Sequence, residues 1–300
     1  MAKALLAVVV FIFVGRFMVR HLGDVRWPDE PICWPLALGA VPTYALFVIC
    51  RAGAFRLAVR AAGGKVAPQR ALLAATIPPL LRYIPGRVAA TAGTVAYLSG
   101  TGTGVARASV AAVLAGLTNV ASATLLLVAG TAWREAPAGD TLLLWALAGL
   151  ALCAVGLHPS VLRCGVRLMS RLTRQPIDGF QPHPLQTLRM VGWTLLSWIA
   201  LGTGYALVGL AVGQIAVTHV PTVVWSVAAA TTVGFLAVFA PAGLGVREGA
   251  LLLLLSPTLG APAAAMLAVL GRCWQTLLEL AAAGVVWPWA RLPVATTAAR

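Results

Sequence analysis

Charged residues in apolar surroundings are the positions of this sequence best suited to chemistry. Arg247 and Glu248 stand side by side in "LAVFAPAGLGVREGALLLLL", between two of the most apolar runs of the chain. One Arg or Asp at the centre of a membrane helix costs roughly 2.5 to 3.5 kcal/mol on insertion scales. Adjacent helix positions point about 100° apart, so the two residues cannot satisfy each other well. Each of them therefore needs a partner elsewhere in the fold.

The charges expected at membrane level are mostly cationic. They are four arginines and two glutamates: Arg82, Arg87, Arg247, Arg272, Glu248 and Glu279. Arg272, Gln275 and Glu279 are spaced by three and four residues, so they share one face of a helix. A surplus of arginine in an apolar cavity favours an anion, and a phosphate matches the guanidinium fork. The alternative is that these arginines extend to lipid phosphates at the membrane surface without a specific substrate.

The composition indicates a membrane protein. Of the 300 residues, 60% are hydrophobic and 10% are charged, and the mean hydropathy is +0.90. A soluble domain is more polar than this, and no polar block is long enough for a separate aqueous domain. Residues 1–300 are therefore expected to form one integral membrane domain. The net charge is +14, and the basic residues cluster at the ends of apolar segments. Membrane topology and anionic headgroups explain this distribution better than nucleic-acid binding does.

The expected architecture is an all-α polytopic transmembrane helix bundle of about 7–8 helices. A spanning helix needs about twenty apolar residues, and the candidate segments are 4–20, 32–50, 108–132, 141–159, 190–217, 221–240 and 261–290. The first resembles a signal peptide but lacks a cleavage site, so an uncleaved helix is expected. Basic residues crowd the connections at 51–70 and 163–189, which predicts that both, and the N-terminus, are cytoplasmic.

Two stretches resist the simple count of spans. The prolines of 75–93 and the proline and glycines of 240–249 disfavour continuous helix. Irregular backbone at membrane depth is tolerated where protein buries it or where it lines a wet cavity. We therefore expect two re-entrant or broken-helix elements, 78–87 and 241–249, that meet near the midplane, and a possible inverted repeat. Whether 246–256 re-enters or spans, and hence the side of the C-terminus, stays open.

Other chemistry has little support in the sequence. The histidines lie far apart with no HExxH, and "SGTGTGVAR" at Ser99 to Arg107 follows no strand and lacks a GK[ST] ending. No catalytic residue, metal or cofactor is therefore expected. A membrane transferase acting on a lipid phosphate would need a base, for which only Glu248 and Glu279 are available. The five cysteines form no CxxC and are expected to be buried structural thiols.

The order of the motifs resembles a known family. "RYIPGR" at 82–87, after the basic stretch "RAGAFRLAVRAAGGKV", and "APAGLGVREGALLLLL" from Ala240, followed by Arg272, resemble the lysylphosphatidylglycerol synthase transmembrane-region family of flippase-like integral membrane proteins. The likeness covers about 30–290. The family pattern P-x-G-x-G-x-R-E is matched by five residues: Pro241, Gly243, Gly245, Arg247 and Glu248.

The resemblance implies a multi-pass protein of a bacterial-type inner (cell) membrane that takes part in lipid transport for the cell envelope. Its partner would be an anionic phospholipid or a polyprenyl-phosphate-linked lipid. Members that transfer lysine carry an extra soluble domain, for which this chain has no room, so we expect no enzyme. The alternative is an accessory or scaffold protein for an envelope-biosynthesis enzyme. The candidate substrate-binding residues are Arg82, Pro85, Gly86, Arg87, Pro241, Gly243, Gly245, Arg247, Glu248, Arg272, Gln275 and Glu279.

Overall fold

The expected helical architecture is confirmed by a computed structural model. It describes residues 31–83, 88–99, 103–132, 139–173, 180, 183–237, 243 and 245–290, which contain helices and no strand. The α-helices are α2 (Trp34–Ala61), α3 (Pro68–Thr76), α4 (Val88–Leu98), α5 (Val105–Ala132), α6 (Gly139–Leu157), α7 (Pro159–Thr173), α8 (Pro184–Ala211), α9 (Val220–Leu236), α10 (Val246–Leu259) and α11 (Ala261–Ala290). Two 3-10 helices are η1 (Pro78–Tyr83) and η3 (Val217–His219). The predicted segment 4–20 lies outside the described residues.

Helix length and composition identify a multi-pass membrane protein. In the described ranges, 5 helices are long and apolar enough to cross a membrane, or up to 6 if the bent pair α6 and α7 counts as one span. Large apolar side chains point outward from them, among them Leu144, Leu152 and Leu277, which are 67%, 74% and 67% exposed. An apolar outer surface of this extent is unfavourable in water and suits a lipid environment.

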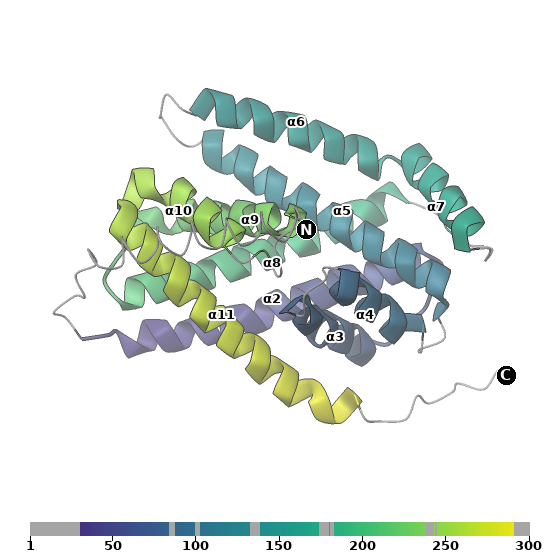
Figure 1. Ribbon diagram of the computed structural model, residues 1–300, viewed down its shortest axis with the longest axis horizontal. Coiled ribbons are helices and arrows are strands. Elements are labelled where there is room, and N and C mark those ends of the chain that lie inside the picture. The colour runs from purple at the N-terminus through teal and green to yellow at the C-terminus, as the bar shows by residue number, and fades with distance from the viewer. Residues whose placement is uncertain are drawn as a thin grey trace, which may run out of the picture.

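The centre of the bundle is the antiparallel pair α2 and α8. At one end the Cys33 amide donates to the Ala211 carbonyl at 2.8 Å, and at the other the Gln186 side chain donates to the Leu57 carbonyl at 3.0 Å. Helix α5 crosses this pair, where the Trp198 indole donates to the Asn119 carbonyl at 3.2 Å. Figure 1 shows α6 lying outside α5, and α11 running diagonally over the opposite side of the bundle.

The first broken element, 78–87, lies between two short helices. Helix α3 has 9 residues and α4 has 11, whereas a span needs about twenty. Between them, Pro78 begins η1, as expected where two prolines remove backbone donors. Gly93 of α4 lies against the Leu81 side chain of η1, so the two pieces pack closely together. Residues 84–87 lie outside the described residues.

The second broken element separates α9 from α10. Gly243 and Gly245 both adopt positive φ angles, +67° and +81°, which residues with a Cβ rarely tolerate. The chain reverses here, and α10 returns antiparallel to α9, with Arg247 beside Gly234. Helix α10 has 14 residues, about 21 Å of helix, which is short of the length of a full span.

Two predicted connections are largely helical. Helix α2 continues through Ala61, so much of the expected 51–70 connection belongs to it, because its basic residues are good helix formers. Most of the first half of the expected 163–189 connection is α7, which was not predicted as a helix because it is amphipathic and contains no long apolar run. The expectation of buried thiols was wrong for Cys33, Cys164 and Cys273, which are exposed, whereas Cys50 is buried.

Candidate functional site

Arg247 is the centre of a buried polar cluster. Its side chain is 4% exposed, although it occupies the second position of α10. Its Nη2 donates to the Tyr205 hydroxyl at 2.5 Å and to Gln275 Oε1 at 2.6 Å. The guanidinium carbon also lies 5.5 Å from the centroid of the Tyr205 ring, within the range of a cation–π interaction. A buried arginine is thus held by a phenol and an amide from two other helices.

Glu248 has different partners from its neighbour. Its Oε2 accepts a hydrogen bond from the Gly245 amide at 2.8 Å, which satisfies a donor at the start of α10. Its Oε1 lies 3.6 Å from Nε of Arg272 on α11. The side chains of this ion pair are only about a tenth exposed, at 10% and 13%. The prediction that adjacent Arg247 and Glu248 need separate partners is confirmed.

The shared face of α11 is also confirmed. Gln275 accepts from Arg247 and from the Tyr205 hydroxyl, at 3.0 Å for the latter, and its Nε2 donates to Glu279 Oε1 at 2.6 Å. Gln275 and Glu279 are 2% and 7% exposed. The Gln275 amide thus uses both its oxygen and its nitrogen within the cluster, and these hydrogen bonds fix the orientation of the Gln275 side chain.

Two glycines permit the close approach of the helices that carry the cluster. A Cβ at Gly271 of α11 would overlap the ring of Tyr205, and a Cβ at Gly234 of α9 would lie 2.8 Å from Cβ of Arg247. Close packing through small residues is the usual way for helices to associate in lipid. Here Gly271 lets Tyr205 approach the polar face of α11, and Gly234 lets α9 pack against Arg247.

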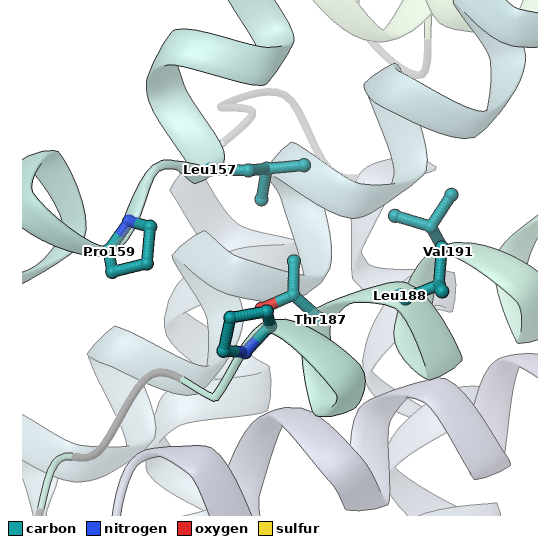
Figure 2. A pocket seen from close by; sticks show the side chains of 6 residues that line it. Leu157, Pro159, Thr187, Leu188 and Val191 are labelled. Carbon is teal, nitrogen blue, oxygen red and sulfur yellow. The ribbon is translucent and has the colours of Figure 1, made fainter.

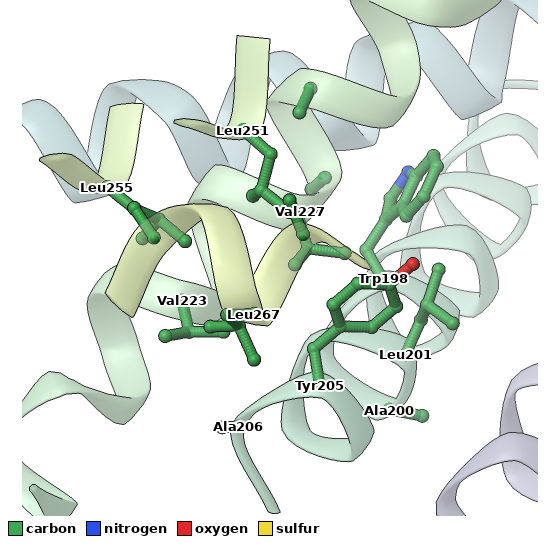
Figure 3. Close-up of a cluster of buried hydrophobic side chains, with 14 of the residues drawn as sticks. Trp198, Ala200, Leu201, Tyr205, Ala206, Val223, Val227, Leu251, Leu255 and Leu267 are labelled. Carbon is green, nitrogen blue, oxygen red and sulfur yellow. The ribbon is translucent and has the colours of Figure 1, made fainter. Parts of the chain in front are cut away.

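Apolar and aromatic side chains surround the cluster on the α8 side. Figure 3 shows the Tyr205 side chain within the packed core that also contains Trp198 and Leu201 of α8. The Tyr205 and Trp274 rings meet edge to face, with centroids 5.7 Å apart. Tyr205 is six residues, about 9 Å of helix, before the end of α8 at Ala211. The polar groups of the cluster are therefore enclosed by apolar packing within the length of a spanning helix.

The described cluster balances its formal charges. It contains two arginines, Arg247 and Arg272, and two glutamates, Glu248 and Glu279. The excess of cations predicted from the sequence therefore comes from Arg82 and Arg87. Arg82 belongs to η1, but its side chain lies outside the described residues, as do Pro85, Gly86, Arg87 and Pro241. Helix α11 packs against α3, which precedes the first broken element, and against α10, which begins within the second.

Tyr205 is the member of the site that the sequence did not indicate. It lies in the run "LGTGYALVG", where a single tyrosine among small residues suits both core packing and a hydrogen bond. It could have been predicted from Arg247, because a buried arginine requires hydrogen-bond acceptors and Tyr205 is a polar residue in a neighbouring apolar helix.

No group of three or more His, Cys, Asp or Glu side chains among the described residues could hold a metal ion. A comparison with known proteins adds no identity, since neither a protein-family description nor a curated protein matches the sequence.

Proposed function

We propose that this protein moves an anionic lipid, a phospholipid or a polyprenyl-phosphate-linked lipid, between membrane leaflets in a flippase-like manner. The observation that carries the proposal is the burial of Arg247 beside a helix break, with neutral acceptors on its Nη2. An ionisable residue within a membrane bundle is by default a sign of function. The resemblance of the 82–87 and 240–255 motifs to flippase-like proteins of a bacterial-type inner membrane supports the same proposal.

The acceptors of Arg247 Nη2 can be exchanged for a lipid phosphate. A phenol and an amide carry no charge, whereas a phosphate forms shorter and stronger charge-assisted hydrogen bonds with a guanidinium group. A phosphate that enters the cluster would take over the positions of the Tyr205 hydroxyl and Gln275 Oε1. In this scheme Arg247 binds the headgroup, and the pair of Arg272 and Glu248 holds α10 against α11.

The physical reason for such a site is the cost of moving a headgroup through hydrocarbon. A bare phosphate that leaves water faces a barrier of many kcal/mol, and a polar path lowers it by replacing hydration. The acyl or prenyl chains would stay in the lipid throughout. No nucleotide-binding motif accompanies the site, so we propose that movement is downhill or coupled to an ion gradient.

The test is a lipid-exchange assay with the purified protein in liposomes. Fluorescent phosphatidylglycerol, phosphatidylcholine and a polyprenyl phosphate are compared by the bleaching of outer-leaflet label with dithionite. We expect the wild type to accelerate exchange of the anionic lipids. We expect Arg247→Gln to slow it by about tenfold or more, because a hydrogen bond to a charged group contributes about 1.5 to 3 kcal/mol.

The matched control is Arg189→Gln, which removes an exposed arginine from α8. Thermal unfolding of each variant in detergent separates loss of function from loss of fold. Unchanged anionic-lipid exchange by a folded Arg247→Gln protein would overturn the assigned role.

A second candidate function is that of an accessory or scaffold protein for an envelope-biosynthesis enzyme. The observation that favours it is that Arg247, Gln275 and Glu279 are joined by hydrogen bonds within the protein and that Glu248 is paired with Arg272. In that case the charges stabilise the fold. The expected result is then no lipid exchange by the wild type, together with a large loss of thermal stability in Arg247→Gln.

A further inference from the structure

Helix α7 has an exposed basic face next to an exposed apolar one. Arg163, Arg167 and Arg171 recur every four residues and are all exposed. Seven residues apart, Val161 and Leu168 are 44% and 57% exposed and lie on a neighbouring face. A helix with these two faces in contact with its surroundings is typical of one that lies in a membrane interface.

Packing holds α7 in this orientation. The helix turns by 62° from the direction of α6 at a short break after Leu157. On its third face, Leu162 is 8% exposed and packs with Val166 into a core cluster that includes residues of α2 and α5. The basic face is therefore fixed to the bundle and does not depend on membrane binding to form.

An apolar slot opens where α7 begins. It has a volume of about 250 Å³ and lies between the α6–α7 break and the first turns of α8, as Figure 2 shows. Its lining is Leu157, Pro159, Pro184, Thr187, Leu188 and Val191. Apart from the Thr187 hydroxyl, these side chains are apolar, so the slot suits a hydrocarbon chain better than a polar ligand.

The slot and the basic face meet at Arg163. Its Nε donates to the Pro159 carbonyl at 3.1 Å, and Pro159 is one of the residues that line the slot. Arg167 lies one turn further along the same face. Positive charge thus flanks an apolar slot, the arrangement expected for a lipid that has a phosphate headgroup and a hydrocarbon chain.

We propose that α7 and this slot form a binding site for an anionic phospholipid of the adjacent leaflet. The phosphate lies on Arg163 and Arg167, and part of one acyl chain occupies the slot. The site differs from the Arg247 cluster, since Figure 1 shows α7 and α10 at opposite ends of the molecule. The α7 site does not depend on the proposed lipid movement, because it is tested by lipid binding and not by lipid exchange.

Cys164 gives a direct probe of this site. It is exposed on α7, next to Arg163 in sequence, whereas Cys273 is exposed on α11. One protein keeps Cys164 and carries Cys33→Ser and Cys273→Ser, and the control protein keeps Cys273 and carries Cys33→Ser and Cys164→Ser. A fluorophore on the remaining exposed thiol is quenched by brominated phosphatidylglycerol or brominated phosphatidylcholine in mixed bilayers.

We expect phosphatidylglycerol to be enriched near Cys164 and not near Cys273. Arg163→Gln with Arg167→Gln should reduce this enrichment by about fivefold for each arginine. The charge-matched control, Arg60→Gln with Lys65→Gln, removes two exposed cations elsewhere and should leave it unchanged. Equal quenching by the two lipids, or equal loss in both double variants, would overturn the proposal.

Two further arms separate the chain from the headgroup. Val191→Trp fills the slot and should reduce enrichment, whereas Leu196→Trp, at an exposed position of the same helix, should not. Free glycerol phosphate at millimolar concentration should not displace the lipid. Displacement by it, or equal enrichment in both tryptophan variants, would mean that the site binds phosphate alone and that the lipid assignment is wrong.

Discussion

Arginine is used in two opposite environments in this protein. Arg247 is 4% exposed and donates to Tyr205 and Gln275 inside the bundle. Arg163 and Arg167 are exposed on α7. The first environment requires partners supplied by the protein, because a buried guanidinium group that lacks them is very unfavourable. The second allows water or lipid headgroups to serve instead, so substitution at the two sites should have very different consequences.

The comparison also shows what a helix break contributes. At the second broken element, the glycines with positive φ let α10 begin inside the bundle, so that Arg247 and Glu248 are both buried. At the α6–α7 break, the chain bends by 62°, and α7 packs on the bundle through Leu162 while its arginines remain exposed. Whether an arginine that follows a helix break is buried or exposed thus depends on which face of the next helix meets the bundle.

The largest expected effect on stability is that of Arg272→Met. It leaves Glu248 in an apolar setting without its partner at 3.6 Å, and breaking a buried ion pair in this way costs about 3 to 5 kcal/mol. Thermal or denaturant unfolding in detergent measures the loss. Arg163→Met on the exposed face of α7 is the control, and equal stability of the two variants would contradict the assignment of a buried pair.

A smaller effect is expected for Gly271→Val. The new side chain would overlap the ring of Tyr205, and overpacking of this kind costs about 1 to 3 kcal/mol. Gly284→Val is a matched control on the same helix, because a Cβ there meets nothing within 4 Å. Similar unfolding temperatures for the two variants would show that α8 and α11 do not pack as closely as described.

Tyr205→Phe tests the hydroxyl without the ring. The change removes the bonds to Arg247 and Gln275 and keeps the aromatic face over the guanidinium group. We expect a loss of about 0.5 to 2 kcal/mol, since hydrogen bonds between helices in membranes are modest. Tyr205→Leu, which also removes the ring, should cost more. If Tyr205→Phe leaves the free energy of unfolding unchanged, the hydroxyl is not a stabilising partner.

The smallest effect on stability is expected for Arg167→Gln. An exposed substitution on α7 should change the free energy of unfolding by less than about 0.5 kcal/mol. A large loss of stability in Arg167→Gln would mean that α7 holds the bundle together through its arginines.

High salt should reduce lipid enrichment near Cys164 while leaving the buried cluster intact, because exposed charges are screened far more than buried ones.

Apolar runs predicted the spanning helices well where they were continuous. The segment 261–290 coincides with α11, and 108–132 lies within α5. The expected 190–217 begins after α8 does, because Pro184 and the His183 side chain, which accepts from the Leu185 amide, start the helix earlier in a polar stretch. Helix α7 was not predicted, because its arginines interrupt the apolar residues and leave no continuous hydrophobic run.

The sequence alone determined that the chain is helical and membrane-embedded, because mean hydropathy and run length fix how many segments favour lipid over water. It also determined that Arg247 and Glu248 need separate partners, since neighbouring helix positions diverge. Only the tertiary structure decided that those partners are Tyr205, Gln275 and Arg272. Local periodicity says which face of a helix is polar, but the neighbour that this face meets depends on the packing of helices far apart in sequence.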